Sequence, residues 1–446
     1  MQKTVTEKEN ERIVLAEADV VVLGGGPAGI GAAVGAADAG ASVIIVERYG
    51  FLGGIPTICN MEPSSWCRQK ETVMPGGVQA LLEKKMLERS AAFPSFFMPS
   101  ASLVYDTELM KQILDDFVLA HNIKPIFHCV VSEPYYEGEK LRGVFVESKS
   151  GREIILGRRF VDCTGDADFA ARCGCPFEMC DLGPDEKTDL MFGTTIFGVS
   201  DVDTEKVMEN LNAHPEMLDR IRHEFISDGF KRAMADGYPV PPEGFADKII
   251  FNRMTRAEVT AVNRVRVPVD GTDVLSITEA EIRSRKCCLA TLELLKRYEP
   301  GFEEARLRHF STAMGIRETR RIKGNYQLTL EDIDGECRFD DSVGVYPVCS
   351  DGPARVRVAT GAYFQIPFRM LVPAGPKKAA CLLVAGRCVS STKDATHTTR
   401  GVDFAFASGQ AAGAASALSI KENQDSGNVN LSGLQDELKR QGVRID

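Results

Sequence analysis

Several features are scarce in this sequence, and each scarcity excludes a class of protein. Glycines and Asp38 interrupt the longest apolar region, 20–46, so it is not a membrane span. The first fifteen residues carry too many charges for the apolar core of a secretion signal. Basic residues total 53 against 63 acidic ones, and the net charge of −10 disfavours a nucleic-acid or anionic-membrane surface. We therefore expect a soluble cytoplasmic protein with no nucleic-acid partner and no membrane span.

The thirteen cysteines show no regular spacing, and an odd number cannot all pair, so we expect mostly reduced thiols. The nearest approach to a metal site is the run Cys163, Cys173, Cys175 and Cys180. Zinc and iron–sulfur sites use paired C-x2-C units, which this run does not contain. We therefore predict no metal site and no iron–sulfur cluster.

What the sequence does contain is an α/β pattern in separated pieces. Two β-branched runs, at 20–23 and 43–46, flank a glycine-rich turn and a small-residue helix, which is the pattern of a βαβ unit. We predict a Rossmann-like nucleotide-binding domain, with a central parallel sheet and a β-meander, and an inserted α+β substrate or cap domain. The predicted boundaries are 1–58, 103–175 and 376–423 for the nucleotide-binding domain, 59–102 and 176–375 for the cap domain, and 424–446 for a C-terminal helix.

Local patterns predict the other elements. In the helix predicted over 106–121, Leu109, Ile113 and Phe117 recur at the spacing of a buried face. Thr278 and Glu281 fit a capping box for a helix whose apolar stripe contains Ile282, Leu289, Leu292 and Leu295. The meander strands are predicted at 125–131, 141–148 and 153–163, further strands at 260–267 and 380–385, and further helices at 79–89, 204–236, 278–298, 402–421 and 432–441.

The strongest signal is the loop Gly24–Gly29 between the first strand and the first helix. Gly24 allows the tight turn, Gly26 lets the backbone approach a pyrophosphate, and Gly29 lets the helix pack close to the sheet. The helix N-terminus presents free N–H groups and a positive dipole end to phosphate. Glu47 ends the next strand, where it can accept hydrogen bonds from ribose hydroxyls and would repel a 2′-phosphate. The motif predicts a dinucleotide site and disfavours NADP, but it does not by itself distinguish FAD from NAD.

Two later segments, VDCTGDADFA at 161–170 and LLVAGRCVS at 382–390, each place an apolar strand before a Gly-Asp or Gly-Arg turn. Together with GGGPAG, ERYGFLGG, GIRETRRIKGNYQLTLEDI and HTTR…GQAAG, they occur in the order expected for one group. The chain resembles the FAD-dependent oxidoreductases of the fumarate-reductase-like superclass over about residues 13–443. The resemblance is specific for fold and cofactor and poorly specific for substrate. No second GxGxxG motif follows a strand, so we expect no separate NAD(P)H domain.

The resemblance implies a set of FAD contacts. It also implies that the long helix containing Gly409 points its N-terminus toward the flavin pyrimidine, where it can stabilise negative charge. Relatives that attach FAD covalently use a histidine just before the Gly-Gly loop, and this chain has none before His121, so we expect non-covalent FAD. The implied contacts are Gly24, Gly26, Pro27, Ala28, Gly29, Glu47, Arg48, Gly53, Gly54, Val130, Gly165, Asp166, Gly386, Arg387, Gly409 and Ala411.

Four side chains near these segments are candidates for catalysis. His397, in a threonine-rich loop, can exchange the proton that accompanies hydride transfer, or only hydrogen-bond the loop. Arg400 can bind a substrate carboxylate or the flavin C2 oxygen, or fix the loop. Arg317 can anchor substrate or belong to an inter-domain ion-pair network. Cys59 can be a redox partner of the flavin, but the distance in sequence to the next cysteine, Cys67, favours simple packing.

These observations favour an enzyme that transfers a hydride between flavin N5 and a C–H bond of a small organic substrate. The substrate is anionic if Arg317 and Arg400 both face the flavin ring. The alternative is a flavin electron-transfer subunit that works with a protein redox partner, although the sequence lacks iron–sulfur cysteines. A module that uses its dinucleotide only structurally ranks last. The sequence does not identify the electron donor or acceptor, and a homo-oligomer is the default expectation.

Overall fold

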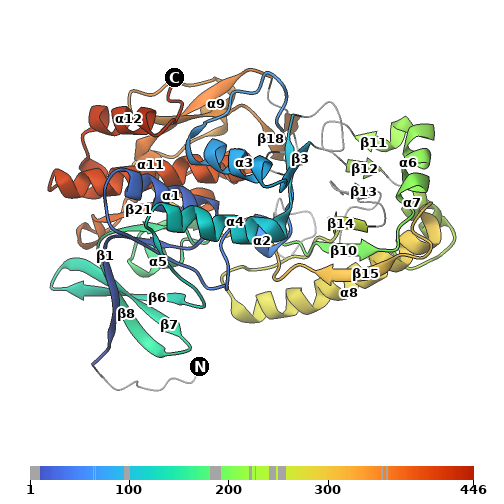
Figure 1. The fold of residues 1–446 in the computed structure, drawn as a ribbon, viewed down its shortest axis with the longest axis horizontal. Coiled ribbons are helices and arrows are strands. Elements are labelled where there is room, and N and C mark those ends of the chain that lie inside the picture. Colours follow the sequence, from blue (N-terminus) through green and yellow to red (C-terminus); the bar gives the residue numbers. More distant parts are fainter. Residues whose placement is uncertain are drawn as a thin grey trace.

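The computed structural model describes residues 11–63, 65, 67–94, 101–180, 192–219, 224–226, 228–240, 248–249, 258–352, 355–357 and 360–446. Its central sheet has seven strands (Figure 1). Five of them run parallel in the order β5 (Lys124–Ile126), β2 (Val43–Val46), β1 (Val14–Leu23), β8 (Gly151–Asp162) and β21 (Leu382–Val384).

Strand β8 is long enough to pair twice on its outer side. Its C-terminal end pairs with β21, and its N-terminal half pairs with the antiparallel strand β7 (Lys140–Ser148), which β6 (Val130–Glu137) follows. The sheet is therefore mixed, with a parallel part and a β-meander. This arrangement confirms the predicted α/β fold class.

Two small-residue helices, α1 (Pro27–Asp38) and α11 (Val402–Lys421), pack against each other beside β1 (Figure 1). Glycine permits the contact, because a Cβ added to Gly409 would lie 2.0 Å from the Ala28 carbonyl oxygen. A Cβ on Gly413 would lie 1.9 Å from that of Ala32. The two helix backbones thus touch directly, which joins the first and last parts of the nucleotide-binding domain.

The inserted part carries its own sheet and its own hydrophobic core. The sheet has the order β14 (Glu258–Val262), β10 (Phe197–Ser200) and β15 (Arg306–Phe310). Its core contains side chains from this sheet and from the helices α6 (Thr204–Ala213), α7 (Asp228–Ala235) and α8 (Val274–Tyr298). Figure 1 shows these elements on the side of the molecule away from the meander.

The division between the two cores differs from our predicted boundaries. Helix α3 (Gly77–Glu88) and the strand pair β17 (Ser342–Pro347) and β20 (Tyr363–Pro367) fall in segments that we assigned to the cap domain. Their buried side chains share one core with α1, α11 and the C-terminal helix α12 (Leu431–Arg440). We therefore propose a smaller cap domain, whose core residues span 197–314.

Three predicted elements differ from the structure, two because they are interrupted and one at its start, each for a local reason. The helix predicted over 204–236 is two helices, because Pro215 follows His214 and proline disfavours helical backbone before it. The strand predicted over 125–131 is β5 and β6, with His128 between them at a φ of +54°. The last helix of the cap domain starts at Val274, four residues before Thr278, because the Asp273 side chain accepts from the Leu275 N–H.

Two predicted buried faces are also partly wrong. Helix α4 (Thr107–Ala120) buries Ile113 and Phe117 as expected, but Leu109 is 45% exposed because Met110 takes the inward position. On α8, Leu292 and Leu295 are buried, whereas Ile282 and Leu289 lie on the outer side. The helix predicted over 402–421 has the predicted bounds in the structure, as α11.

The remaining elements are short. Within the described ranges, no helix is long and apolar enough to cross a membrane. The other elements are α2 (Ile55–Ile58), β3 (Ala92–Pro94), β4 (Leu103–Tyr105), α5 (Asp168–Arg172), β9 (Phe177–Met179), β11 (Leu218–Asp219), β12 (Glu224–Ile226), β13 (Lys248–Ile249), β16 (Arg320–Ile322), α9 (Leu330–Asp334), β18 (Ser350–Gly352), β19 (Arg355–Arg357) and α10 (Lys393–Thr399).

Candidate active site

The fold itself requires two glycines of the first loop. Gly24 has a φ of +102°, and a Cβ there would lie 2.5 Å from the Cys163 carbonyl oxygen. A Cβ on Gly29 would lie 1.8 Å from the Gly24 carbonyl oxygen. These two positions let the strand turn sharply into α1 and let the helix pack against the sheet, as the motif predicts.

Gly26 is different, because the fold does not need a glycine there. Its backbone is extended, with φ −75° and ψ −173°, a conformation that any residue adopts. The atom nearest to an added Cβ is the Gly54 Cα, 3.6 Å away, which is an ordinary van der Waals contact, so a Cβ is allowed there. A phosphate group fits this cradle, where the α1 N–H groups begin.

The helices that start at glycine caps support the same interpretation. In the described structure, α1, α3 and α11 start at Gly26, Gly76 and Gly401, and none of these caps has a side-chain capping bond. At α3 the Gln410 side chain accepts from the Val78 N–H instead, so that start is occupied within the chain. Most other helices of eight or more residues start at a capping side chain. Uncapped N-termini keep their N–H groups available, which suits a pyrophosphate at α1 and an electron-rich ring at α11.

The Gly-Gly loop lies directly against this first loop. The Gly53 N–H donates to the Gly25 carbonyl oxygen at 2.9 Å. A Cβ on Gly54 would lie 2.7 Å from the Gly26 Cα and 3.1 Å from the Pro27 Cδ. The structure thus brings together two segments that the resemblance assigned to one cofactor.

Glu47, Arg48 and Val130 mark one end of this site. The Glu47 carboxylate accepts from the Gly25 N–H at 2.7 Å and from the Tyr49 N–H at 2.9 Å, and burial raises the pKa of Glu47. Both oxygens keep a further lone pair for ribose hydroxyls. The neighbour of Val130, Cys129, donates its N–H to the Glu47 carbonyl oxygen at 3.0 Å, so the start of β6 lies beside Glu47. Arg48 is exposed here.

At the carboxyl ends of β8 and β21, the two predicted turns are joined. Arg387 donates to the Gly165 carbonyl oxygen at 2.8 Å and to the Asp166 carboxylate at 2.5 Å. Asp166 also accepts from the Thr319 hydroxyl at 2.7 Å. Ligands of open α/β sheets bind at this edge, so the position agrees with a cofactor role for these residues.

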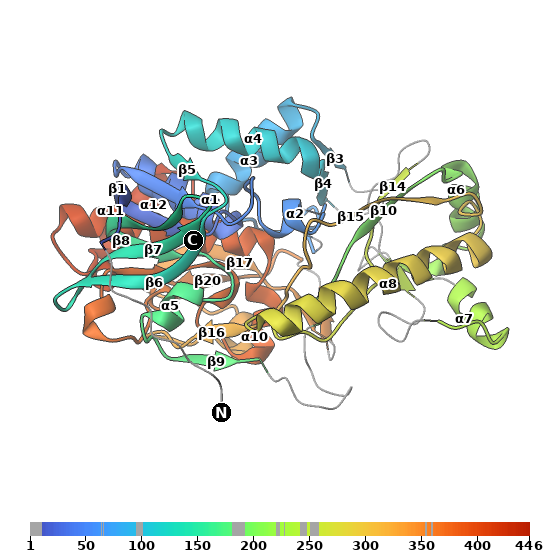
Figure 2. The same cartoon turned by 90° about the horizontal axis from the view of Figure 1, so that it is seen from below.

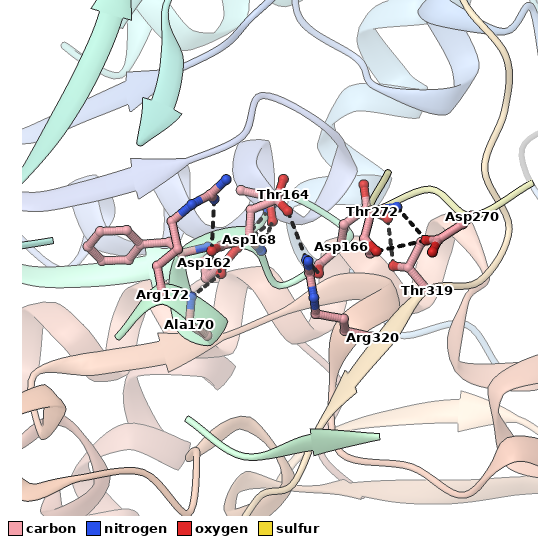
Figure 3. A network of polar contacts seen from close by, with 12 residues as sticks. Asp162, Thr164, Asp166, Asp168, Ala170, Arg172, Asp270, Thr272, Thr319 and Arg320 are labelled. Atoms are coloured by element: carbon pink, nitrogen blue, oxygen red, sulfur yellow. Dashed lines mark hydrogen bonds and ion pairs between the residues drawn. The ribbon is translucent and has the colours of Figure 1, made fainter. Parts of the chain in front are cut away.

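Three residues outside the predicted set of cofactor contacts organise this edge (Figure 3). Fully buried Asp162 accepts from the backbone N–H and hydroxyl of Thr164 and from the N–H groups of α5. Thr319, described above, is the second of these residues. The third is Arg320, which donates to the Asp166 carbonyl oxygen and to the Asp168 carboxylate, at 3.0 Å each. The sequence signal for Asp162 is an aspartate two residues before a threonine at the end of a strand. No local pattern indicates that Thr319 and Arg320 contact this turn.

Three predicted FAD contacts near the C-terminal end of the chain lie in two different settings. Gly386 lies at the β21 turn, where its N–H donates to the Ser408 hydroxyl at 3.1 Å. Gly409 and Ala411, in contrast, are buried in the interior of α11, and Gly409 contacts the α1 backbone. Because neither residue offers free surface to a ligand, we propose that Gly409 and Ala411 serve helix packing rather than FAD binding.

The surroundings of Cys59 suit the packing role that the sequence favoured over a redox role. It is fully buried, and its thiol donates to the Thr194 carbonyl oxygen at 3.5 Å. Burial raises the pKa of the Cys59 thiol, so the reactive thiolate is disfavoured. A packing role at the junction of α2 and the inserted sheet explains these observations.

A stoichiometric titration checks the packing role. We expect Cys59→Ala to lose about 1 kcal/mol of stability while the holoprotein takes up the same number of electrons per FAD. The measurement is an anaerobic dithionite titration of both proteins. Electron uptake that exceeds the flavin in the wild type, and falls to the flavin value in the variant, would show a redox thiol.

Two of the other buried cysteines, Cys175 and Cys180, show the same effect of burial. It raises the pKa of Cys175 to about 12 and of Cys180 to about 11. In the part of the chain that the structure describes, no group of three histidine, cysteine or acidic side chains is arranged to hold a metal ion.

The remaining catalytic candidates meet along the segment Gly315–Arg321. Arg317 donates to the Phe192 carbonyl oxygen at 2.6 Å and lies close enough to Cys59 to interact electrostatically. Next to Cys59, the Asn60 amide forms a 2.6 Å hydrogen bond with the His309 ring of β15. Arg317 thus belongs to the junction between the α2 segment and the inserted sheet.

His397 and Arg400 lie on the other side of this segment, and His397 lies in a helix rather than in a loop. Thr392 caps α10 by accepting from the Ala395 N–H, so the threonine-rich stretch is helical. Both side chains interact electrostatically with Glu318. Burial raises the pKa of the Glu318 carboxyl group, and Arg321 is the main neighbour that lowers it. Glu318 is 2% exposed and also pairs with Arg321.

A Rossmann-type sheet, a phosphate cradle and joined turns at its carboxyl edge define a dinucleotide-binding protein with a cap. The sequence profile of the FAD dependent oxidoreductase family matches residues 19–438, and the chain belongs to this family. It is thus an FAD-dependent oxidoreductase that binds FAD non-covalently, which confirms the predicted cofactor and enzyme class. No protein with a curated description matches the sequence significantly.

Several solved structures of flavoenzymes are distantly similar to this chain. A flavin-dependent brominase, Bmp2, is 14% identical with a TM-score of 0.50, and the match covers 94% of this chain and 84% of the brominase. A geranylgeranyl bacteriochlorophyll reductase-like protein from Thermoplasma acidophilum is 12% identical, with a TM-score of 0.48 over 95% and 83% of the two chains. The p-nitrophenol 4-monooxygenase from Pseudomonas putida is 12% identical with a TM-score of 0.47, and the match covers 96% of this chain and 88% of the monooxygenase.

Proposed function

We propose that the protein transfers a hydride between flavin N5 and a C–H bond of a small anionic organic substrate. The observation that carries this proposal is the course of the segment Gly315–Arg321. Its Arg317 turns to the junction beside the Gly-Gly loop, its Glu318 turns to α10, and its Thr319 bonds Asp166. Arginines therefore lie on both sides of a segment that bonds Asp166, one of the residues proposed to hold FAD.

Bound FAD supplies the hydride acceptor or donor. In our proposal, Arg317 and Arg400 bind the anionic group of the substrate, because a guanidinium offers paired donors that match a carboxylate. His397 takes up or releases the proton that accompanies the transfer. The sheet β14-β10-β15 forms the cap that excludes water from the substrate.

The roles of the two arginines can be tested separately from FAD binding. We expect Arg317→Gln and Arg400→Gln each to raise the KM for a carboxylate substrate about 10- to 100-fold, since hydrogen bonds to charged groups contribute about 1.5–3 kcal/mol. The measurement is anaerobic bleaching of the flavin absorbance by a panel of carboxylic acids and their amides. Arg306→Gln is the control, because Arg306 is an exposed arginine of the cap, paired with Asp201.

The same panel separates the proposal from its alternative. Bleaching by acids but not by their amides supports an anionic substrate, and equal bleaching by both contradicts it. If no small molecule bleaches the flavin but a reduced redox protein does, the protein is an electron-transfer subunit and the proposed hydride transfer is wrong.

A further inference from the structure

The outer face of α8 carries an apolar stripe. Leu275, Ile282 and Leu289 are 75%, 49% and 46% exposed. They are seven residues apart, which is close to two helical turns, so all three lie on one side of the helix. The opposite side of α8 is buried in the core of the inserted part, where Leu292 and Leu295 pack. The stripe therefore is not needed for packing within the chain.

The stripe is symmetric about its centre. Ile282 lies midway between Leu275 and Leu289, and the three span about 21 Å along the helix. Two antiparallel copies of α8 that cross at Ile282 would place Leu275 of each copy against Leu289 of the other. A two-fold axis through Ile282 thus makes the stripe complementary to itself, as a symmetric dimer interface requires.

The charges beside the stripe have the same symmetry. Glu279 lies three residues before Ile282, and Lys286 lies four residues after it; both are exposed. In the antiparallel arrangement, Glu279 of one copy faces Lys286 of the other, and the axis produces this pair twice. A parallel arrangement would bring like charges together, which is unfavourable.

The position of α8 leaves room for a second copy. Figure 1 shows α8 along one edge of the molecule, and Figure 2 shows the same helix lying across the side that faces the viewer. The helix is firmly held from behind, since Glu281 accepts from the Met314 N–H at 2.6 Å and Ser284 is hydrogen-bonded to Thr195 at 2.7 Å.

We propose that α8 is the interface of a homodimer, in which it packs antiparallel against α8 of a second copy of this chain. The binding partner of α8 is a second copy of this chain rather than another protein, because both the apolar stripe and its flanking charges are complementary to themselves. In this dimer the two inserted parts contact each other through α8. This proposal does not depend on the proposed reaction.

Sedimentation of the FAD-loaded protein tests the interface. We expect the wild type to sediment as a dimer, and Ile282→Glu to weaken dimerisation at least tenfold with unchanged FAD content and circular dichroism. Leu119→Glu is the matched control, because Leu119 is a 57% exposed leucine on α4, and it should remain a dimer. A monomeric wild type, or an Ile282→Glu variant that dimerises normally, overturns the proposal.

Charge reversal tests the antiparallel arrangement. We expect Glu279→Lys to weaken the dimer and the double variant Glu279→Lys with Lys286→Glu to restore it, since each pair is then reversed. A cysteine at the two-fold axis gives an independent readout: Ile282→Cys should form an intermolecular disulfide on mild oxidation, and Leu289→Cys should not. Absence of rescue together with equal cross-linking of both cysteines would show that the copies, or another protein, bind α8 differently.

Discussion

Replacement of Gly26 by valine is expected to weaken FAD binding about 100-fold or more, which corresponds to roughly 3 kcal/mol, while the fold stays intact. The backbone at Gly26 is extended and the nearest atom to an added Cβ is 3.6 Å away, so neither the backbone conformation nor a Cβ clash requires glycine there. The branched side chain would instead fill the space that the phosphates need at the N-terminus of α1.

Two other glycines serve as controls for this prediction. Gly433→Val adds the same side chain where an added Cβ also has 3.6 Å of clearance, far along the chain in α12, and FAD affinity should not change. Gly29→Ala should unfold the domain, because its Cβ would lie 1.8 Å from a backbone oxygen. The measurements are FAD titration by fluorescence and thermal unfolding of each apoprotein. Normal FAD binding by a folded Gly26→Val protein would place the phosphates elsewhere.

A second large effect, on the pH dependence of stability, is expected from Asp403. This residue lies fully buried in the first turn of α11. Gln79 of α3 donates to its carboxyl group, and Ser65 is also hydrogen-bonded to it. Burial raises the pKa of Asp403 to about 8, with a further contribution from Glu83, while Arg68 acts in the opposite direction. The carboxyl group is therefore protonated in the folded protein at neutral pH.

The stability of the protein should fall as the pH rises because of this group. Between about pH 4 and pH 8, folded Asp403 keeps a proton that the unfolded chain has released, so the free energy of unfolding decreases with pH. The stabilisation that the Asp403 proton provides is complete below the pKa of Asp403 in the unfolded chain. It is lost above the pKa of Asp403 in the folded protein, and its full size is roughly 5 kcal/mol. Asp403→Asn cannot ionise and should be several kcal/mol more stable than the wild type at alkaline pH.

Denaturant unfolding of the apoprotein at a series of pH values checks this expectation. The wild type should lose stability from weakly acidic to alkaline pH, and Asp403→Asn should lose much less. Asp436→Asn, at an exposed position on α12, is the control and should follow the wild type. Parallel stability curves for the wild type and Asp403→Asn would mean that Asp403 is ionised in the folded protein.

The sequence determined the parts of this protein that depend on neighbours in the chain. Strand, turn and helix follow one another between Val20 and Val46, so the phosphate loop, the requirement for Gly24 and Gly29, and the acidic end of β2 could all be predicted. The small residues of α11 also predicted its bounds. They did not determine the role of Gly409, because a small residue suits a ligand contact and a helix contact equally well.

Only the tertiary structure decided which distant segments meet. Thr319 and Arg320 bond the turn after β8 from about 150 residues away, and no local pattern encodes such a pairing. The structure also showed that Ile282 and Leu289 face outward, and that Asp403 faces Gln79 across the core. Backbone turns and helix starts depend on steric limits within a few residues, whereas burial and partner choice depend on how whole elements pack together.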